Sequence, residues 1–242
     1  MKKYISVFEM ITRSTLYKVL AVLVMMVGIQ LVLFWREMQS HIDDTMSGME
    51  SMVNGSHMIW VLAVGFLLIT VILCWSGCNI GSNQGYTLRR LQISETEVCV
   101  LQAIYNGLCY FLLWASQVAV LFGAGMLYAK EAQNLTNQTI MLAFYRNAYM
   151  HSILPLADGI GWFLLILMLV GCAIATAIFP HQQRRGKVSF AVIAAVVLVF
   201  ILFPRGLGDD VTFLVSYPLA LLVGYGVYCL VMSCVKGENK DE

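Results

Sequence analysis

Six apolar segments alternate with short polar stretches along the chain, and each approaches or exceeds the length of a membrane-crossing helix. About 20 predominantly apolar residues are needed to cross roughly 30 Å of hydrocarbon, where no water can satisfy free backbone groups. The pattern predicts an all-α polytopic membrane protein with a single transmembrane domain over residues 1–242. The six expected spans are Leu16–Trp35, Met58–Trp75, Val98–Tyr128, Ile153–Phe179, Val188–Phe203 and Phe213–Val235.

The first 15 residues have a helical pattern of their own. Tyr4, Ile5 and Phe8 recur at helical spacing with Ile11 and Thr12, and charged side chains occupy the other side. A short helix with one apolar and one basic face is typical of the membrane interface. We therefore expect an N-terminal interfacial helix over residues 1–15, which serves as an anchor or also contacts a cytosolic subunit.

Lys and Arg residues indicate how the chain is oriented, because cytoplasmic loops retain them. With the N-terminus inside, 11 of the 15 Lys and Arg residues fall in cytosolic segments and 4 fall outside. Segments rich in Lys and Arg alternate with segments poor in them at every loop. Both termini are therefore expected in the cytosol.

Composition agrees with a membrane protein and excludes other classes. The chain is 60% hydrophobic and 12% charged, with a mean hydropathy of +0.77, whereas soluble domains carry about 25% charged residues. A net charge of +1 provides no basic field for nucleic acid. No zinc-protease, serine-hydrolase or phosphate-loop motif occurs, so the sequence predicts neither an enzyme nor a cofactor on this chain.

The loop between the second and third spans, residues 76–97, has the most distinctive pattern. A Gly, Ser and Asn cluster breaks the chain after Ser76, and Ser94 with Glu97 matches a capping box that starts the next helix. Between them lies a short stretch in which apolar and polar residues alternate. It contains Tyr86, Thr87, Leu88, Arg89, Arg90, Leu91, Ile93 and Ser94.

This glycine-containing break, followed by Thr-Leu-Arg-Arg-Leu-x-Ile-Ser and the third of six spans, resembles the first cytosolic loop of ABC-2 type transporter permeases. The resemblance in layout covers nearly the whole chain, and the motif covers about Gly85 to Glu97. It implies the membrane subunit of a bacterial ABC exporter in the cell membrane. Its cargo would be hydrophobic or amphipathic: a lipid, a drug or an antimicrobial peptide.

The resemblance also implies partners. Tyr86–Ser94 would be the coupling helix that docks on a separate ATPase subunit, which would bind the ATP and magnesium. Arg89 and Arg90 would be charge partners there, and Leu88 and Leu91 apolar anchors. Taken alone, the two arginines are better explained as residues that fix topology, and it is the combined layout that favours coupling. A second permease subunit, identical or related, would complete a twelve-helix dimer. The external segment 204–210 is shorter than the re-entrant helices usual in the family.

Polar residues within the spans are the remaining candidates. Asp158, in the predicted fourth span with Pro155 and two glycines, is read as a gate or cargo contact, or as an interfacial acid paired with Arg146 or His151. Gln117 and Asn106, with Gln30, are read as hydrogen-bonding links between helices or as cargo contacts. The alternatives to an exporter are a secondary transporter or channel that uses Asp158, and a non-transporting scaffold or sensor.

The first external loop combines methionines with histidines. Met46, Met49 and Met52 lie near His41 and His57, and thioether with imidazole suits copper. A spacing of three also suits the apolar face of a short helix resting on the outer surface, so both readings remain open.

Overall fold

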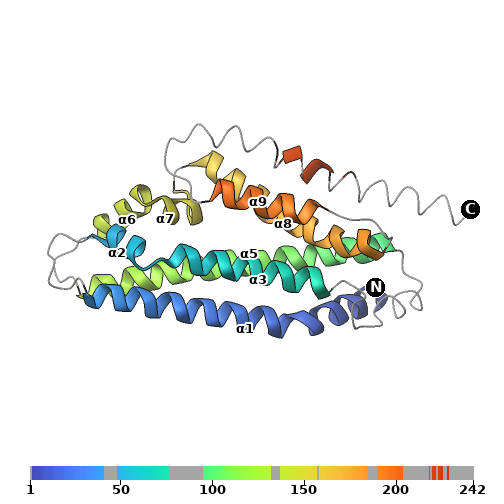
Figure 1. Ribbon diagram of the computed structural model, residues 1–242, viewed down its shortest axis with the longest axis horizontal. Coiled ribbons are helices and arrows are strands. Elements are labelled where there is room, and N and C mark those ends of the chain that lie inside the picture. Colours follow the sequence, from blue (N-terminus) through green and yellow to red (C-terminus); the bar gives the residue numbers. More distant parts are fainter. Residues whose placement is uncertain are drawn as a thin grey trace, which may run out of the picture.

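The computed structural model is a bundle of long helices (Figure 1). It describes residues 2–40, 48–76, 95–131, 137–156, 158–184 and 190–203, together with residues 218, 220, 221, 223–225 and 228. Within these residues the regular structure is entirely helical, as predicted. The helices are α1 (Lys2–Ser40), α2 (Met49–Gly55), α3 (Met58–Ser76), α5 (Glu95–Glu131), α6 (Asn137–Arg146), α7 (Ala148–Ile153), α8 (Gly159–Arg184) and α9 (Ala191–Leu202).

Four described helices are long and apolar enough to cross a membrane. Their candidate spans are Thr15–Ser40, Met58–Trp75, Glu97–Lys130 and Gly159–Gln183. Many large apolar side chains on these helices are exposed, which fits a surface covered by lipid. Exposed Tyr17 and Trp35 lie about 27 Å apart along the axis of α1, close to the thickness of the hydrocarbon layer between two interfacial aromatic belts. These four helices indicate a multi-pass membrane protein.

The structure describes most of the fifth predicted span but little of the sixth. The fifth corresponds to α9, which has 12 residues and rises only about 18 Å. It ends at Leu202, and Phe203 is extended because the next residue is Pro204. Most of the predicted sixth span, 213–235, lies outside the described residues.

The N-terminal segment differs from the predicted separate interfacial helix. Helix α1 continues without interruption from Lys2 to Ser40, because neither glycine nor proline occurs before Gly28 to stop it. It is bent in its N-terminal part (Figure 1), where the Thr12 hydroxyl donates to the Phe8 carbonyl at 2.7 Å. Such bonding of threonine back to its own helix bends helices.

The fourth predicted span begins later than expected and ends later. Its start was expected at Ile153, but α7 ends there and α8 begins at Gly159. Pro155 disfavours helical backbone at Leu154, which has φ −131° and ψ 85°. At the other end α8 continues through Pro180 to Arg184, into the segment expected to be a loop.

Helix α5 packs against α8 and α1, α1 packs against α3, and α9 packs on α8. The short helices α2, α6 and α7 gather at the end of the bundle opposite the N-terminus (Figure 1). We call this end the capped end. There the buried side chains of Phe34, Met49, Met58 and Tyr149 belong to one apolar core, and a second core follows along α1, α3, α5 and α8.

Candidate functional site: a buried amide pair and an apolar cavity

A strongly buried polar contact joins α1 and α5. The Gln30 amide donates to Gln117 Oε1 at 2.9 Å, and the Gln117 amide donates to Gln30 Oε1 at 3.0 Å. The two side chains are 0% and 2% exposed. This reciprocal pair confirms the expectation that both glutamines link helices, since a buried amide must find partners within the protein.

Two further groups extend the amide pair. Gln30 also donates to the Met58 carbonyl of α3 at 3.2 Å, and the Tyr149 hydroxyl donates to Gln117 Oε1 at 2.9 Å. Tyr149 comes from α7, outside the candidate spans. Burial raises the pKa of its phenol above the usual value of 10.0, because the charged form would lose its hydration. The network therefore ties three long helices to the capped end through neutral hydrogen bonds.

Asn106 links a second pair of helices. Its amide donates at 3.0 Å to the Thr176 hydroxyl of α8, and both side chains are buried. This contact confirms Asn106 as a link between helices and places it away from the cavity walls described next.

A cavity of about 470 Å³ lies between α3, α5, α8 and α9. Its walls are almost wholly apolar. They are formed by Ile59, Trp60, Leu62, Ala63, Phe66, Tyr110, Leu113, Trp114, Gln117, Ile153, Leu165, Met168, Leu169, Cys172, Val199, Phe200 and Phe203. Pockets of about 300–1,000 Å³ with apolar walls and few polar groups are typical small-molecule sites.

The cavity has a buried floor and an exposed rim. Tyr110 and Gln117 of α5 and Ile153 of α7, on the floor, are each at most 2% exposed. Trp60 of α3 and Phe200 of α9, on the rim, are 68% and 43% exposed. The cavity therefore opens sideways, between α3 and α9, onto the apolar surface of the bundle.

The polar side chains on the inner part of the wall already have partners. The Trp114 indole N–H donates to the Ile153 carbonyl at 2.8 Å. The hydroxyls of Tyr110 and Thr70 lie 2.9 Å apart; because Thr70 donates its own hydrogen to the Phe66 carbonyl, Tyr110 is the donor between them. With Gln117 held by Gln30, the Trp114, Tyr110 and Gln117 side chains need no hydrogen bond from a ligand.

Asp158 lies at the start of α8, before its first turn. Its Oδ1 accepts from the Ile160 backbone N–H at 3.1 Å, the contact of a helix N-cap, and its Oδ2 is 3.8 Å from His151 Nε2. Of the two partners expected for Asp158, the structure thus places His151 beside it, and the interfacial position stays a prediction. Pro155 is buried in the preceding turn, and neither residue lines the cavity.

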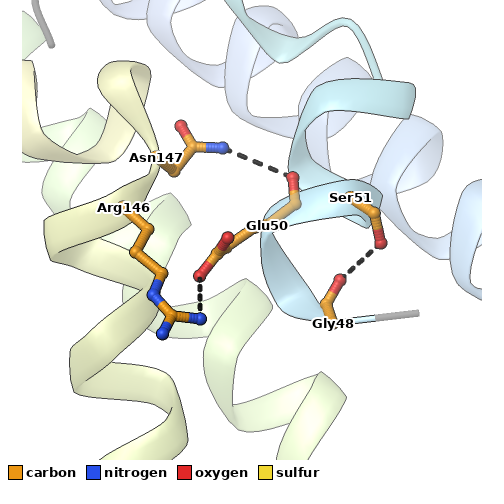
Figure 2. Close-up of polar contacts among 5 residues, drawn as sticks. All are labelled: Gly48, Glu50, Ser51, Arg146 and Asn147. Carbon is orange, nitrogen blue, oxygen red and sulfur yellow. Dashed lines mark hydrogen bonds and ion pairs between the residues drawn. The ribbon is translucent and has the colours of Figure 1, made fainter. Parts of the chain in front are cut away.

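Polar contacts at the capped end dock α2 against α6 and α7 (Figure 2). The Asn147 amide donates to the Glu50 carbonyl at 3.3 Å and to Asn54 Oδ1 at 3.0 Å. Its Oδ1 accepts from the backbone of Tyr149 and Met150, which makes Asn147 the N-cap of α7. Arg146 lies 4.0 Å from the Glu50 carboxylate at the surface (Figure 2).

Met49 and Met52, in the loop predicted to be the first external one, pack inward. Met49 and Met52 are buried in the apolar core of the capped end, so the expected short helix is confirmed as α2. His41 and Met46 lie outside the described residues. Among the residues described, no group of three or more His, Cys, Asp or Glu could hold a metal ion.

The coupling residues Tyr86, Thr87, Leu88, Arg89, Arg90, Leu91, Ile93 and Ser94 lie outside the described part of the chain. Of the other sequence candidates, Gln117 alone lines the cavity. Sequence reasoning missed Tyr149, Trp114 and the cavity itself. Tyrosine and tryptophan are common near membrane interfaces, and their spacing carries no signal for a contact made across helices.

Comparison with known proteins adds no identification: no protein-family model, curated protein or solved structure matches the chain.

Proposed function

We propose that the chain is the membrane-spanning subunit of a bacterial ATP-driven exporter for hydrophobic or amphipathic molecules. In this proposal it has six spans, both termini are cytosolic and the capped end faces outward. A separate ATPase subunit supplies the energy through residues 86–94, and a second permease subunit completes the pathway.

The observation that carries the proposal is the apolar cavity within the bundle. Its volume and its almost wholly apolar walls suit a hydrophobic molecule or the apolar part of an amphipathic one. The sequence contains no phosphate-binding loop, so ATP-driven movement requires another chain. The resemblance of residues 85–97 to a coupling loop provides the place where that chain would dock.

An ion-coupled transporter or channel is less well supported. Asp158 caps α8 beside His151 and lies away from the cavity. Within the four described spans, Asp, Glu, Lys and Arg occur only near the ends. An intramembrane acid that could carry a proton is therefore not found in the described spans.

Co-purification with an ATPase subunit tests the proposal. The tagged chain is purified from membranes of the source cell, and ATPase subunits that carry a phosphate-binding loop are identified by mass spectrometry. We expect one such subunit with the wild-type chain and its loss with the double change Arg89→Glu and Leu91→Asp.

A matched double change controls for charge reversal and added acidity. Lys130→Glu with Leu142→Asp alters exposed residues at the capped end. This variant should retain the ATPase. Retention of the ATPase by both variants would contradict the assignment of the coupling loop. Absence of any ATPase from the wild-type preparation would contradict the exporter function.

A further inference from the structure

The cavity extends from the middle of the bundle toward the capped end. Its α3 residues belong to the first part of that helix, which follows α2. Its α9 residues, Val199 to Phe203, lie where α9 ends, and Ile153 is the last residue of α7. A molecule that reaches the cavity from the bilayer therefore comes from the leaflet at the capped end.

The rim of the cavity is continuous with the apolar surface that lipid covers. Trp60 and Phe200 both line the cavity and stand exposed on the outside of the bundle. Across the opening, α3 and α9 approach through Phe66 and Phe200, whose rings meet edge to face at 6.3 Å. Access is thus from the side, through lipid, and needs no passage through water.

The chemistry of the wall selects a hydrocarbon. None of its residues is Asp, Glu, Lys, Arg or His, so a charge placed inside would be unpaired. Trp114, Tyr110 and Gln117 are already hydrogen-bonded within the protein. A cavity of about 150 Å³ is enough for benzene, so about 470 Å³ accommodates several times that amount of hydrocarbon.

From this geometry we infer that the cavity binds an acyl chain of a membrane lipid drawn sideways, between α3 and α9, from the leaflet at the capped end. The inference rests on the proposed export function and deepens it by naming lipid of the outer leaflet, the side on which that proposal places the capped end, as the cargo class. The lipid headgroup stays at the interface near Trp60. The acyl chain leaves one apolar environment, the bilayer, for another, the cavity. Packing rather than dehydration therefore provides the binding free energy, and the bound lipid exchanges with lipid of the bilayer.

Photolabelling of the purified full chain tests the inference. The chain is placed in nanodiscs containing a phosphatidylcholine with a diazirine at the end of one acyl chain, and the labelled residues are located by mass spectrometry. Leu165 and Ile166 are adjacent on α8, but Leu165 is buried on the cavity wall and Ile166 is exposed outside it. We expect label on Leu165 and Leu113 as well as on Ile166.

A variant pair separates the cavity from the outer surface. Leu169→Trp places a bulky ring in the cavity and should abolish most of the label on Leu165 while leaving the label on Ile166. Its neighbour Val170 is exposed to lipid, so Val170→Trp should leave both labels unchanged. The comparison of Leu165 with Ile166 in the wild-type chain stands even if a variant fails to fold.

Label confined to exposed positions such as Ile166 would overturn the inference, because another part of this chain or a second copy would then fill the cavity. Persistence of the Leu165 label in Leu169→Trp would also overturn it. The assay contains no ATPase and no nucleotide. Absence of an ATPase partner would therefore contradict the exporter function but not the lipid site. An unlabelled cavity together with a retained ATPase would contradict only the assignment of lipid as cargo.

Discussion

Gln30 and Gln117 face one another from α1 and α5, and each amide donates to the carbonyl oxygen of the other, at 2.9 and 3.0 Å. Each glutamine therefore uses a donor and an acceptor in the same pair. A sliding of α1 by one helical turn, about 5.4 Å, would break both bonds at once. The pair thus fixes the register of the two helices beside the cavity.

Replacing one glutamine should lower the free energy of unfolding by more than half as much as replacing both. Gln30→Leu leaves the Gln117 amide without its main partner, and we expect a loss of about 1–2 kcal/mol in the free energy of unfolding. The double change with Gln117→Leu should cost less than the sum of the single changes. Unfolding in mixed micelles, followed by circular dichroism, measures all three variants.

Ser116 provides the control for this cycle. It precedes Gln117, but its hydroxyl donates only within α5, to the Leu113 carbonyl at 2.7 Å. Ser116→Ala should change the unfolding free energy by less than about 0.5 kcal/mol. Additive costs for the two glutamine changes would show that the amides do not act as a pair.

Asn147 and Arg146 are neighbours with different expected contributions at the capped end. Asn147→Ala removes the N-cap of α7 and two bonds to α2, so we expect a loss of about 2 kcal/mol. Arg146→Ala removes an exposed ion pair at 4.0 Å and should cost no more than about 0.5 kcal/mol. Thermal unfolding in detergent compares the two variants.

Hydrogen exchange should show where the loss of the Asn147 cap destabilises the chain. In Asn147→Ala the backbone amides of Tyr149 and Met150 should lose protection, because Asn147 Oδ1 accepts from both. Protection there should be unchanged in Arg146→Ala. Equal loss of protection in both variants would mean that the surface ion pair, rather than the cap, holds α7.

Tyr149 should make the fold less stable at high pH. Its pKa is raised in the folded chain, so the unfolded chain releases the proton first as pH increases. The contribution is fully present below pH 10.0, the usual tyrosine value, and is lost as pH rises through the folded pKa. The alkaline decrease in unfolding free energy should therefore be smaller in Tyr149→Phe than in the wild type.

Ultraviolet difference absorption provides a direct readout of Tyr149. The wild type minus Tyr149→Phe spectrum should lack the tyrosinate band at a pH where free tyrosine is ionised. Appearance of that band near pH 10.0 would mean that the phenol is hydrated rather than buried.

Asp158→Asn should leave both folding and transport nearly unchanged. Asparagine caps a helix as well as aspartate does, whereas Asp158→Ala should cost about 1 kcal/mol by removing the acceptor for the Ile160 N–H. Thermal unfolding and cargo transport by the ATPase-containing complex measure the two effects. Lost transport in a stable Asp158→Asn variant would instead favour the ion-coupled alternative.

If the chain is the proposed exporter, the cavity should be needed for transport. Ala63→Trp fills part of it and should abolish most ATP-driven transport by the reconstituted complex, while stability changes by no more than about 1–3 kcal/mol because the ring enters open space. Val64→Trp, on the exposed side of α3, should transport normally. Equal transport by both variants would place the cargo path elsewhere.

The sequence could predict the features that depend on local pattern. The spacing of Met49 and Met52 predicted the short helix α2, and apolar runs predicted the four described spans. Gln30, Gln117 and Asn106 could be recognised as links because an amide within a span needs a partner.

Features that depend on contacts between distant residues could not be predicted. The partner of Asn106 is Thr176, and Tyr149 reaches Gln117 from a helix that hydropathy alone does not indicate. The start of α8 was placed too early because apolar residues continue on both sides of Pro155, so the hydropathy pattern contains no boundary. The cavity is a property of four helices together and has no local signature.

Helix α1 is continuous over 39 residues, about 58 Å along its path, nearly twice the thickness of the hydrocarbon layer. Its basic first turns and the Gln30 amide belong to the same continuous helix, and Arg13 lies about 25 Å from Gln30 along it. Any tilt of the N-terminal turns therefore reaches the amide pair beside the cavity only through the bent part of α1, so those turns can move while Gln30 keeps its register with Gln117.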